Sequence, residues 1–411
     1  MFLSKLRNKK EVMSWSLYDF ANQPFTTIIV TFVYGAFFTS VIASDENTGT
    51  LFWTWGIAST AIIVSILSPI LGALADKGGF RKFFLILFTW ICAIFSILLY
   101  FPQSGDVFFA LSLFVIANIS FELGSVFCNS YLQDLSEDSN IGKISGFAWG
   151  LGFVGGLLAL FISFSLFELN SVGIRGINIL VGVWFLIFSI PTFIFVKDRK
   201  KDKLTKKHFV DSFDSIKTTF KEVVKYKIIM KFLIARLFFN DGLITIFSLG
   251  GIYAVDTLDF TFDEVMMLGI VLNISAAIGS FVFGYLEDKI GVKKVINISL
   301  VVLVFSTLLA FIAPYFKFQK EIFWIAGVLI GLMVGPNQSC SRSLMAKLTP
   351  KEKQNEFFGF FALTGKATSF LGPVLFGIIT FNFSQQVALW VVIFLFLIGL
   401  ILFNKINFQD E

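Results

Sequence analysis

Charged residues are scarce in this sequence. Only 15% of its 411 residues are Asp, Glu, Lys or Arg, whereas soluble globular chains hold about 25%. Hydrophobic residues reach 56%, and the mean hydropathy is +0.81. A chain of this length with so little charge cannot form one soluble core, so we predict an all-α polytopic membrane protein.

Histidine and cysteine are also scarce. The one histidine, His208, lies in a lysine-rich segment, and the three cysteines (Cys92, Cys128 and Cys340) are far apart within apolar runs. This spacing excludes a metal or disulfide motif. The paired Asp motifs or H-E-x-x-H that an intramembrane enzyme would need are missing as well. We therefore expect no enzymatic activity, no bound metal and no cofactor.

Long apolar runs fill most of the chain. A hydrocarbon core about 30 Å thick requires about 20 apolar residues of helix. Runs of this kind predict twelve membrane spans, at residues 14–42, 51–74, 83–101, 106–130, 143–167, 176–196, 229–255, 264–286, 294–314, 321–345, 355–380 and 385–404.

Lysine and arginine gather on one side of this pattern. With the N-terminus inside, the inner segments include the dense run "KDRKKDKLTKK", whereas the outer loops hold only Arg175, Lys317 and Lys320. The positive-inside rule then places both termini in the cytoplasm. This topology accounts for the net charge of +5, so we expect no nucleic-acid partner.

One long connection divides the spans into two sets of six. We predict an N-terminal six-helix bundle (1–196), a basic cytoplasmic linker (197–228) and a C-terminal six-helix bundle (229–411). An internal repeat supports this division: "GALADKGGFRK" begins at Gly72 and "GYLEDKIGVKK" at Gly284, in equivalent places of the two halves. Duplicated halves are typical of transporters, which bind substrate where the halves meet.

The repeated motif fits two interpretations, a latch between the halves that breaks and re-forms, or simple anchoring of the topology. Its glycines allow a helix to approach closely, and its aspartates can accept hydrogen bonds from a helix N-terminus or pair with a cation. Its basic residues anchor the turn. The loop-motif residues expected to act in gating are Gly72, Asp76, Arg81, Gly284, Asp288 and Lys293.

With its twelve spans, its six-plus-six division and its two G-x-x-x-D-K-x-G turns, the sequence resembles the major facilitator superfamily. The first turn departs from the usual spacing, since Phe80 stands between Gly79 and Arg81. A narrower resemblance is to the vacuole-effluxer-like branch, whose fungal members are autophagy-related permeases. The stretches that carry it include "WSLYDFANQPF", "FCNSYLQDL", "KISGFAWGLGFVGG", "RLFFNDGLITIFSLGGIYA" and "RSLMAKLTP".

This resemblance implies a secondary transporter that works as a permease for a small molecule. Amino-acid efflux is proposed for the fungal members. We expect a monomer in the lipid bilayer of the bacterial cytoplasmic (inner) membrane.

Few ionisable residues lie within the predicted spans. Inserting an Asp, Lys or Arg at a helix centre costs about 2.5 to 3.5 kcal/mol, so each is a functional-site hypothesis by default. The candidates are Asp19, Glu122, Arg236, Asp241, Arg342 and Lys366.

Depth separates these candidates. Asp241 and Lys366 each lie about a dozen residues, or roughly 18 Å, from a cytoplasmic helix start, which places both near the midplane. Asp19 and Arg342 are shallower and are expected to act as gate residues, with Asp19 pairing with Arg342 or Lys366. The expected substrate- or ion-binding residues are Asn22, Glu122, Asn129, Arg236, Asn240, Asp241 and Lys366.

The role and the substrate stay open. The charges either take up a proton coupled to alternating access or form permanent ion pairs that fix the packing. A site with both Asp241 and Lys366 suits a zwitterion such as an amino acid, and a sugar, peptide or nucleoside is the alternative. A channel or a non-transporting receptor on the same fold is the alternative of another class.

Prolines and glycines predict local irregularities in three spans. Pro24 leaves the carbonyl of Phe20 unpaired, so span 1 should bend, with Asn22 or Gln23 satisfying the freed groups. Gly372-Pro373 predicts a kink in span 11. The glycines at 142, 146 and 150 predict a close contact of span 5, either with span 8 or within its own half.

Overall fold

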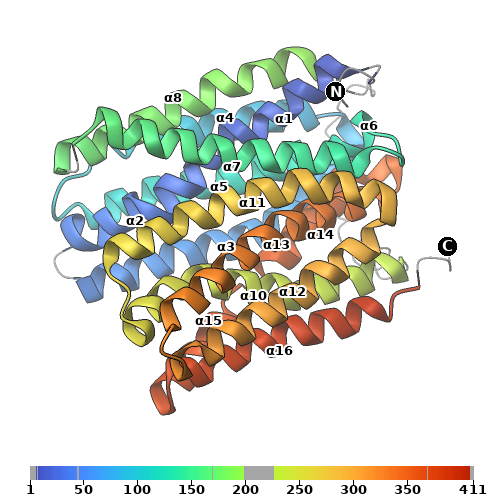
Figure 1. The fold of residues 1–411 in the computed structure, drawn as a ribbon. Coiled ribbons are helices and arrows are strands. Elements are labelled where there is room, and N and C mark those ends of the chain that lie inside the picture. The colour runs from blue at the N-terminus through green and yellow to red at the C-terminus, as the bar shows by residue number, and fades with distance from the viewer. Residues whose placement is uncertain are drawn as a thin grey trace. The chain divides into compact units, whose positions relative to one another are not determined.

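The computed structural model describes residues 6, 8–43, 46–168, 170–198, 226–367 and 369–407, and every regular element in these ranges is a helix (Figure 1). The elements are α1 (Lys9–Pro24), η2 (Phe25–Phe32), α2 (Tyr34–Phe37), η3 (Phe38–Ile42), α3 (Glu46–Gly78), α4 (Arg81–Leu98), α5 (Val107–Ser130), α6 (Leu132–Leu135), α7 (Ile141–Leu166), α8 (Ser171–Phe195), α10 (Lys227–Leu258), α11 (Phe262–Ile290), α12 (Val292–Ile312), η4 (Ala313–Tyr315), α13 (Gln319–Leu348), η5 (Lys351–Lys353), α14 (Gln354–Lys366), α15 (Leu371–Asn382) and α16 (Gln385–Asn404).

Twelve helical segments among the described residues are long and apolar enough to cross a membrane. The predicted number of spans is therefore confirmed, and each predicted span begins and ends within five residues of an observed one. This agreement follows from the physics of the signal, because a run of about 20 apolar residues specifies a span without any tertiary contact.

The described residues group into two compact units. Unit 1 draws on Met1–Leu135, Leu151–Ile216 and Pro350–Ala362, and unit 2 on Ser136–Gly150, Lys217–Thr349 and Leu363–Glu411. This grouping differs from the division predicted from the sequence in two places. The start of α7 belongs to unit 2, and the start of α14 belongs to unit 1. The predicted domain boundaries stay a prediction, and residues 199–225 of the predicted linker, with His208, lie outside the described residues.

Span 1 changes its helical form at its proline. The α-helix α1 ends at Pro24 and the π-helix η2 begins at Phe25. Proline has no N–H, so the carbonyl of Phe20 loses its partner within the helix. Trp184 Nε1 of α8 donates to that carbonyl at 3.2 Å. The indole of a neighbouring helix thus gives this carbonyl a partner, and the role expected of Asn22 or Gln23 stays a prediction.

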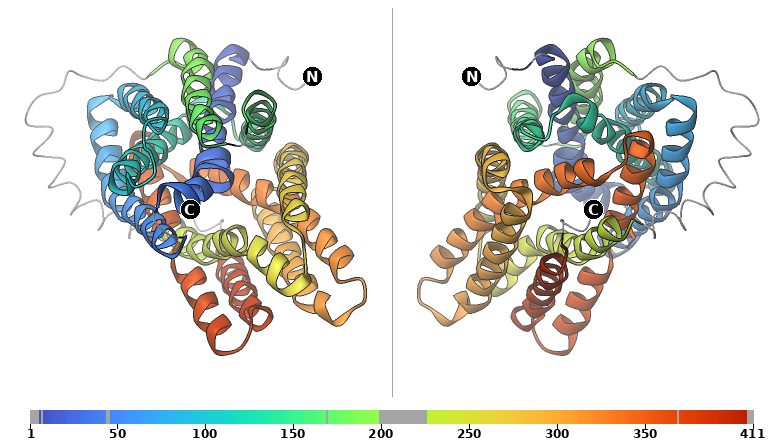
Figure 2. Two further views of the ribbon diagram at one scale, coloured as in Figure 1. Left: turned by 90° about the vertical axis from the view of Figure 1, so that its left-hand side faces the viewer. Right: turned by 90° about the vertical axis from the view of Figure 1, so that its right-hand side faces the viewer.

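Span 11 is interrupted, and not at the predicted position. Helix α14 ends at Lys366 and α15 begins at Leu371. Gly372-Pro373 therefore lies in the first turn of α15, where the missing N–H of a proline needs no partner. After α15 the chain reverses, and both views in Figure 2 show α15 and α16 side by side at the red end of the colour scale.

Candidate functional site

Each copy of the repeated motif ends in a turn that requires glycine. Gly79 after α3 has φ +69°, and Gly291 after α11 has φ +90°. L-residues with a side chain rarely adopt such angles, whereas glycine does so at little cost. Each turn thus has a glycine with positive φ at the same position of the motif, which agrees with the repeat seen in the sequence.

Asp76 in the first copy holds the N-terminus of α14. Its Oδ1 accepts hydrogen bonds from Asn355 N at 3.2 Å and Asn355 Nδ2 at 2.7 Å, and its Oδ2 accepts from Glu356 N at 2.8 Å. A carboxylate suits this place because the first N–H groups of a helix have no partner within the helix and the N-terminus carries partial positive charge. Gly72 makes the approach possible, since a Cβ there would collide with the carbonyl of Asn355.

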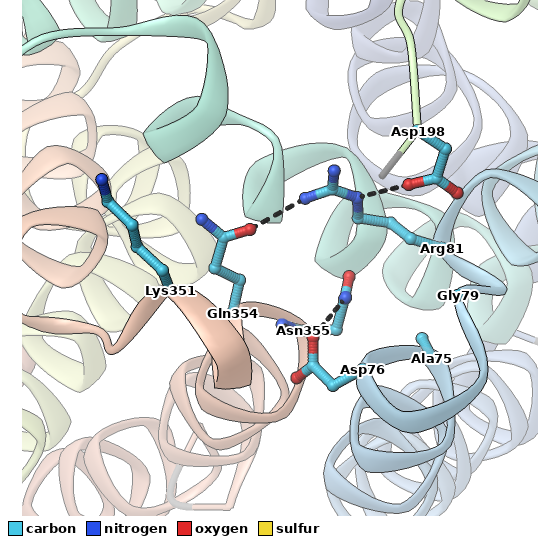
Figure 3. Close-up of a pocket in the computed structure, with 8 residues that line it drawn as sticks. All are labelled: Ala75, Asp76, Gly79, Arg81, Asp198, Lys351, Gln354 and Asn355. Atoms are coloured by element: carbon cyan, nitrogen blue, oxygen red, sulfur yellow. Dashed lines mark hydrogen bonds and ion pairs between the residues drawn. The ribbon is translucent and has the colours of Figure 1, made fainter. Parts of the chain in front are cut away.

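Arg81 gathers several polar groups of unit 1. Its guanidinium donates to Asp134 Oδ2 at 2.7 Å, Gln354 Oε1 at 3.0 Å and Asp198 Oδ1 at 3.3 Å, and it lies 3.6 Å from the ring centroid of Tyr131. Only 3% of Arg81 is exposed, so the ion pairs are screened little by water. Figure 3 shows the small polar pocket beside it. Its lining residues are Ala75, Asp76, Gly79, Arg81, Asp198, Lys351, Gln354 and Asn355.

The second copy holds the N-terminus of α7 in the same way. Asp288 Oδ1 accepts from Gly142 N at 2.9 Å, and Asp288 Oδ2 accepts from Lys143 N at 3.1 Å. Lys143 Nζ also pairs with Asp288 Oδ2 at 3.4 Å. Both interactions proposed for these aspartates from the sequence, a helix N-terminus and a cation, are therefore present.

The glycines of α7 and α11 meet. A Cβ on Gly284 would lie 2.8 Å from Gly146 Cα and 2.9 Å from the carbonyl oxygen of Gly142. The predicted close contact between spans 5 and 8 is confirmed for these residues. Small residues at such a crossing let backbones approach without interlocking side chains.

One lysine of each basic pair binds the C-terminal end of a helix. Lys82 Nζ donates to the carbonyl of Val196, just after α8, at 2.9 Å. Lys293 Nζ donates to the carbonyls of Ile406 at 2.6 Å and Asn404 at 3.2 Å, at the end of α16. The last carbonyls of a helix have no partner within it, and a cation near them is stabilising.

Arg342 of α13 binds the start of α7. Its Nη2 donates to the carbonyl of Ser145 at 2.7 Å, and its Nε donates to Ser145 Oγ at 3.0 Å. Ser145 Oγ in turn donates to the carbonyl of Ser339 at 2.7 Å. Only 2% of Arg342 is exposed. The planar guanidinium thus binds Ser145 through two separate nitrogen atoms, whereas a lysine would offer only one.

Three predicted residues on α10 face the interruption of span 11. Asn240 Nδ2 donates to the carbonyl of Gly365 at 3.1 Å, and Asp241 Oδ2 accepts from Gly372 N at 2.8 Å. Arg236 lies beside the same segment, since a Cβ on Gly365 would be 3.1 Å from Arg236 Nη1. Lys366, the last residue of α14, is half-buried. The structure therefore brings Arg236, Asn240 and Asp241 together with the segment that carries Lys366.

The other predicted residues lie in unit 1, away from this cluster in the chain. Asn22 on α1 is buried, and Asp19 on α1 and Glu122 and Asn129 on α5 are half-buried. Their substrate or gating roles stay predictions. The predicted pairing of Asp19 with Arg342 or Lys366 would join the two units and also stays a prediction.

Sequence reasoning missed several uncharged polar residues. Gln338 of α13 donates from Nε2 to Asn240 Oδ1 at 3.1 Å, and Ser130 Oγ donates to Asn355 Oδ1 at 2.6 Å. The search for ionisable side chains passed over these amides and hydroxyls. An amide side chain within a predicted span is a weaker signal, and it would have found Gln338.

Solved structures identify the fold. The proton:xylose symporter XylE matches with a TM-score of 0.74 at 14% identity, over 97% of this chain and 95% of that chain. The human organic anion transporter MFSD10 matches with a TM-score of 0.73 at 13% identity, over 97% of this chain and 100% of that chain. At such low identity these matches show the fold alone, which is that of the major facilitator superfamily (MFS).

Sequence comparisons define the family. Residues 51–142 and 133–410 match the family described as vacuole effluxer Atg22 like, and the chain belongs to this family. It is 28% identical to the uncharacterized MFS-type transporter YxiO of Bacillus subtilis, covering 96% of this chain and 94% of that protein. It is 24% identical to Autophagy-related protein 22 of Kluyveromyces lactis, covering 78% of this chain and 71% of that protein. The chain is therefore a multi-pass MFS-type membrane transporter for a small molecule and not an enzyme.

Proposed function

We propose that this transporter carries a small zwitterion, with an amino acid as the first candidate, by alternating access. The observation that carries the proposal is the presence of both signs of charge around residues 365–372: Asp241 and Arg236 on α10, and Lys366 at the end of α14. Charges inside a span are costly and mark substrate or ion pathways.

The chemistry of these groups suits the two ends of an amino acid. An arginine fork binds a carboxylate through two parallel hydrogen bonds, and a buried carboxylate attracts an ammonium group. Asn240 adds an amide that already bridges Gln338 and the carbonyl of Gly365. An uncharged sugar would leave both charges unmatched, which disfavours it as a substrate.

The two loop motifs supply the moving contacts in this proposal. Asp76 holds the start of α14, and Asp288 holds the start of α7, each through backbone N–H groups. Such contacts involve few atoms and are made at helix ends, so they can break and re-form as a unit during the transport cycle. We assign Asp19 and Arg342 to the same gating role.

The proposed location is the cytoplasmic membrane of a bacterium, with both termini in the cytoplasm. The support is the distribution of Lys and Arg over the loops and the match to the Bacillus subtilis relative. The fungal relative is named for autophagy, and the family is named for a vacuole effluxer. Export is therefore the direction that we propose.

Counterflow in proteoliposomes tests the proposal. Proteoliposomes that contain the purified protein and are loaded with unlabelled amino acid should take up labelled amino acid. The Asp241→Asn and Lys366→Ala variants should abolish this uptake, although both proteins should remain monodisperse. Matched controls on α10 are Asp256→Asn and Lys231→Ala. Both residues are exposed, so these variants should transport at wild-type rates. Wild-type uptake in both site variants would refute the site.

A further inference from the structure

The start of α15 is capped from another helix. Its N-cap residue, Phe370, has no side chain that can accept a hydrogen bond, and Pro373 has no N–H. Gly372 N is left to find a partner elsewhere, and Asp241 Oδ2 of α10 accepts it at 2.8 Å. A carboxylate from α10 therefore does what an Asp or Ser at the N-cap would ordinarily do.

The other oxygen of this carboxylate is open. Among the described residues, Asp241 Oδ1 has no hydrogen-bond partner, although Asp241 is 0% exposed. An unsatisfied carboxylate oxygen away from water is costly, so a native structure that keeps one invites a functional explanation. The open atom lies on the group that caps α15, at the interruption of a span.

Few charges face this carboxylate. On α10 the charged residue nearest to it in the sequence is Arg236, and on α14 the charged residue nearest to the start of α15 is Lys366. Helices α15 and α16 contain no ionisable residue, and α13 contributes the neutral Gln338. One turn beyond Gln338, α13 carries Arg342, whose guanidinium donates to Ser145.

The start of α15 also fits closely on α10. A Cβ on Gly372 would collide with Thr245 Oγ1 and would lie 3.3 Å from the carbonyl oxygen of Asp241. Thr245 Oγ1 itself donates to that carbonyl at 2.7 Å. Because the donor is a backbone N–H, a change in the bond between Asp241 and Gly372 acts directly on the backbone of α15. The chain segment that precedes α15 connects it to Lys366.

We propose that Asp241 is the proton-binding site of the transporter and that α15 is the element that responds to the proton. The inference rests on the proposed function of this cluster and names its coupling ion. A proton fits the open oxygen because it needs no further ligand, whereas hard metal cations need several oxygens. The proton adds to Oδ1, the carboxylate becomes a neutral acid, and its bond to Gly372 N weakens.

The direction of the effect follows from the charge. A hydrogen bond to an ionised acceptor is roughly twice as strong as one to a neutral acceptor. The cap is therefore strong when Asp241 is ionised at higher pH and weak when it is protonated at lower pH. The start of α15 should loosen as the pH falls, next to the segment that holds Lys366.

Hydrogen–deuterium exchange without any substrate tests this inference. Protection of a peptide covering residues 371–382 is measured in detergent micelles from about pH 8 to about pH 5, with intrinsic exchange rates corrected at each pH. In the wild type and in the exposed control Asp256→Asn, protection should fall about tenfold over this range. Asp241→Asn should show the low protection at every pH.

Asp241→Glu is a second variant that keeps a titratable group, and it should retain a pH-dependent change with a displaced midpoint. The inference is overturned if wild-type protection does not change with pH, or if Asp241→Asn keeps the pH dependence of the wild type. Since no substrate is present, a failure of amino-acid counterflow would reject the proposed substrate and leave this result standing.

Discussion

Removing the carboxylate of Asp76 should release the start of α14. Asp76 is 8% exposed and accepts from two backbone N–H groups of this helix, at 3.2 and 2.8 Å. Hydrogen bonds to charged groups contribute about 1.5 to 3 kcal/mol each, so Asp76→Ala should lower the free energy of opening this turn by about 3 kcal/mol. That corresponds to a roughly 150-fold loss of protection.

Hydrogen–deuterium exchange of a peptide covering residues 354–362 measures this loss. Asp76→Asn keeps a neutral acceptor and should show an intermediate effect, because a neutral acceptor forms a weaker bond. Asp138→Ala, which removes an exposed carboxylate, is the control and should match the wild type. Unchanged protection in Asp76→Ala would show that the carboxylate does not hold the helix.

Three further substitutions test the remaining contacts. Gly146→Leu places a side chain against Gly284 Cα, which a Cβ would already approach to 2.7 Å. It should lower the free energy of unfolding by about 1 to 3 kcal/mol and therefore lower Tm. Arg342→Lys loses the paired bonds to Ser145 and should lower the free energy of unfolding by about 1 to 3 kcal/mol. Tm should fall, and an unchanged Tm would contradict the pairing. Lys293→Ala removes a cation from the end of α16 and should cost only about 0.3 to 1 kcal/mol in the same thermal assay.

The spans and the loop motifs could be predicted because their signals are local. A run of about 20 apolar residues specifies a span by itself. The repeat likewise showed that Asp76 and Asp288 would bind a helix N-terminus or a cation. It could not show which helix each would bind, because the partners α14 and α7 are remote in the sequence.

The interruption of span 11 shows where local signals end. Gly372-Pro373 predicted an irregularity, but the break lies before it, between Lys366 and Leu371. Its position depends on Asp241 of α10 capping Gly372 N, a contact between residues 131 positions apart.

The amide groups that complete the clusters had no comparable signal. Gln354 joins Arg81 only because α14 starts beside α4 in the folded unit, and Gln338 meets Asn240 only because α13 lies beside α10. Charge and hydropathy rank ionisable residues first, so neutral partners are found only once the helices are placed.

A thermal-shift screen of the purified transporter tests the central claim, that the charges around Asp241, Arg236 and Lys366 bind a zwitterion. The panel contains amino acids, sugars, peptides and nucleosides at matched concentrations. Binding to the folded state raises Tm by an amount that increases with the logarithm of the ligand concentration relative to its Kd. Stabilisation by amino acids that is lost in Asp241→Asn is the predicted result, and stabilisation by an uncharged sugar alone would contradict the claim.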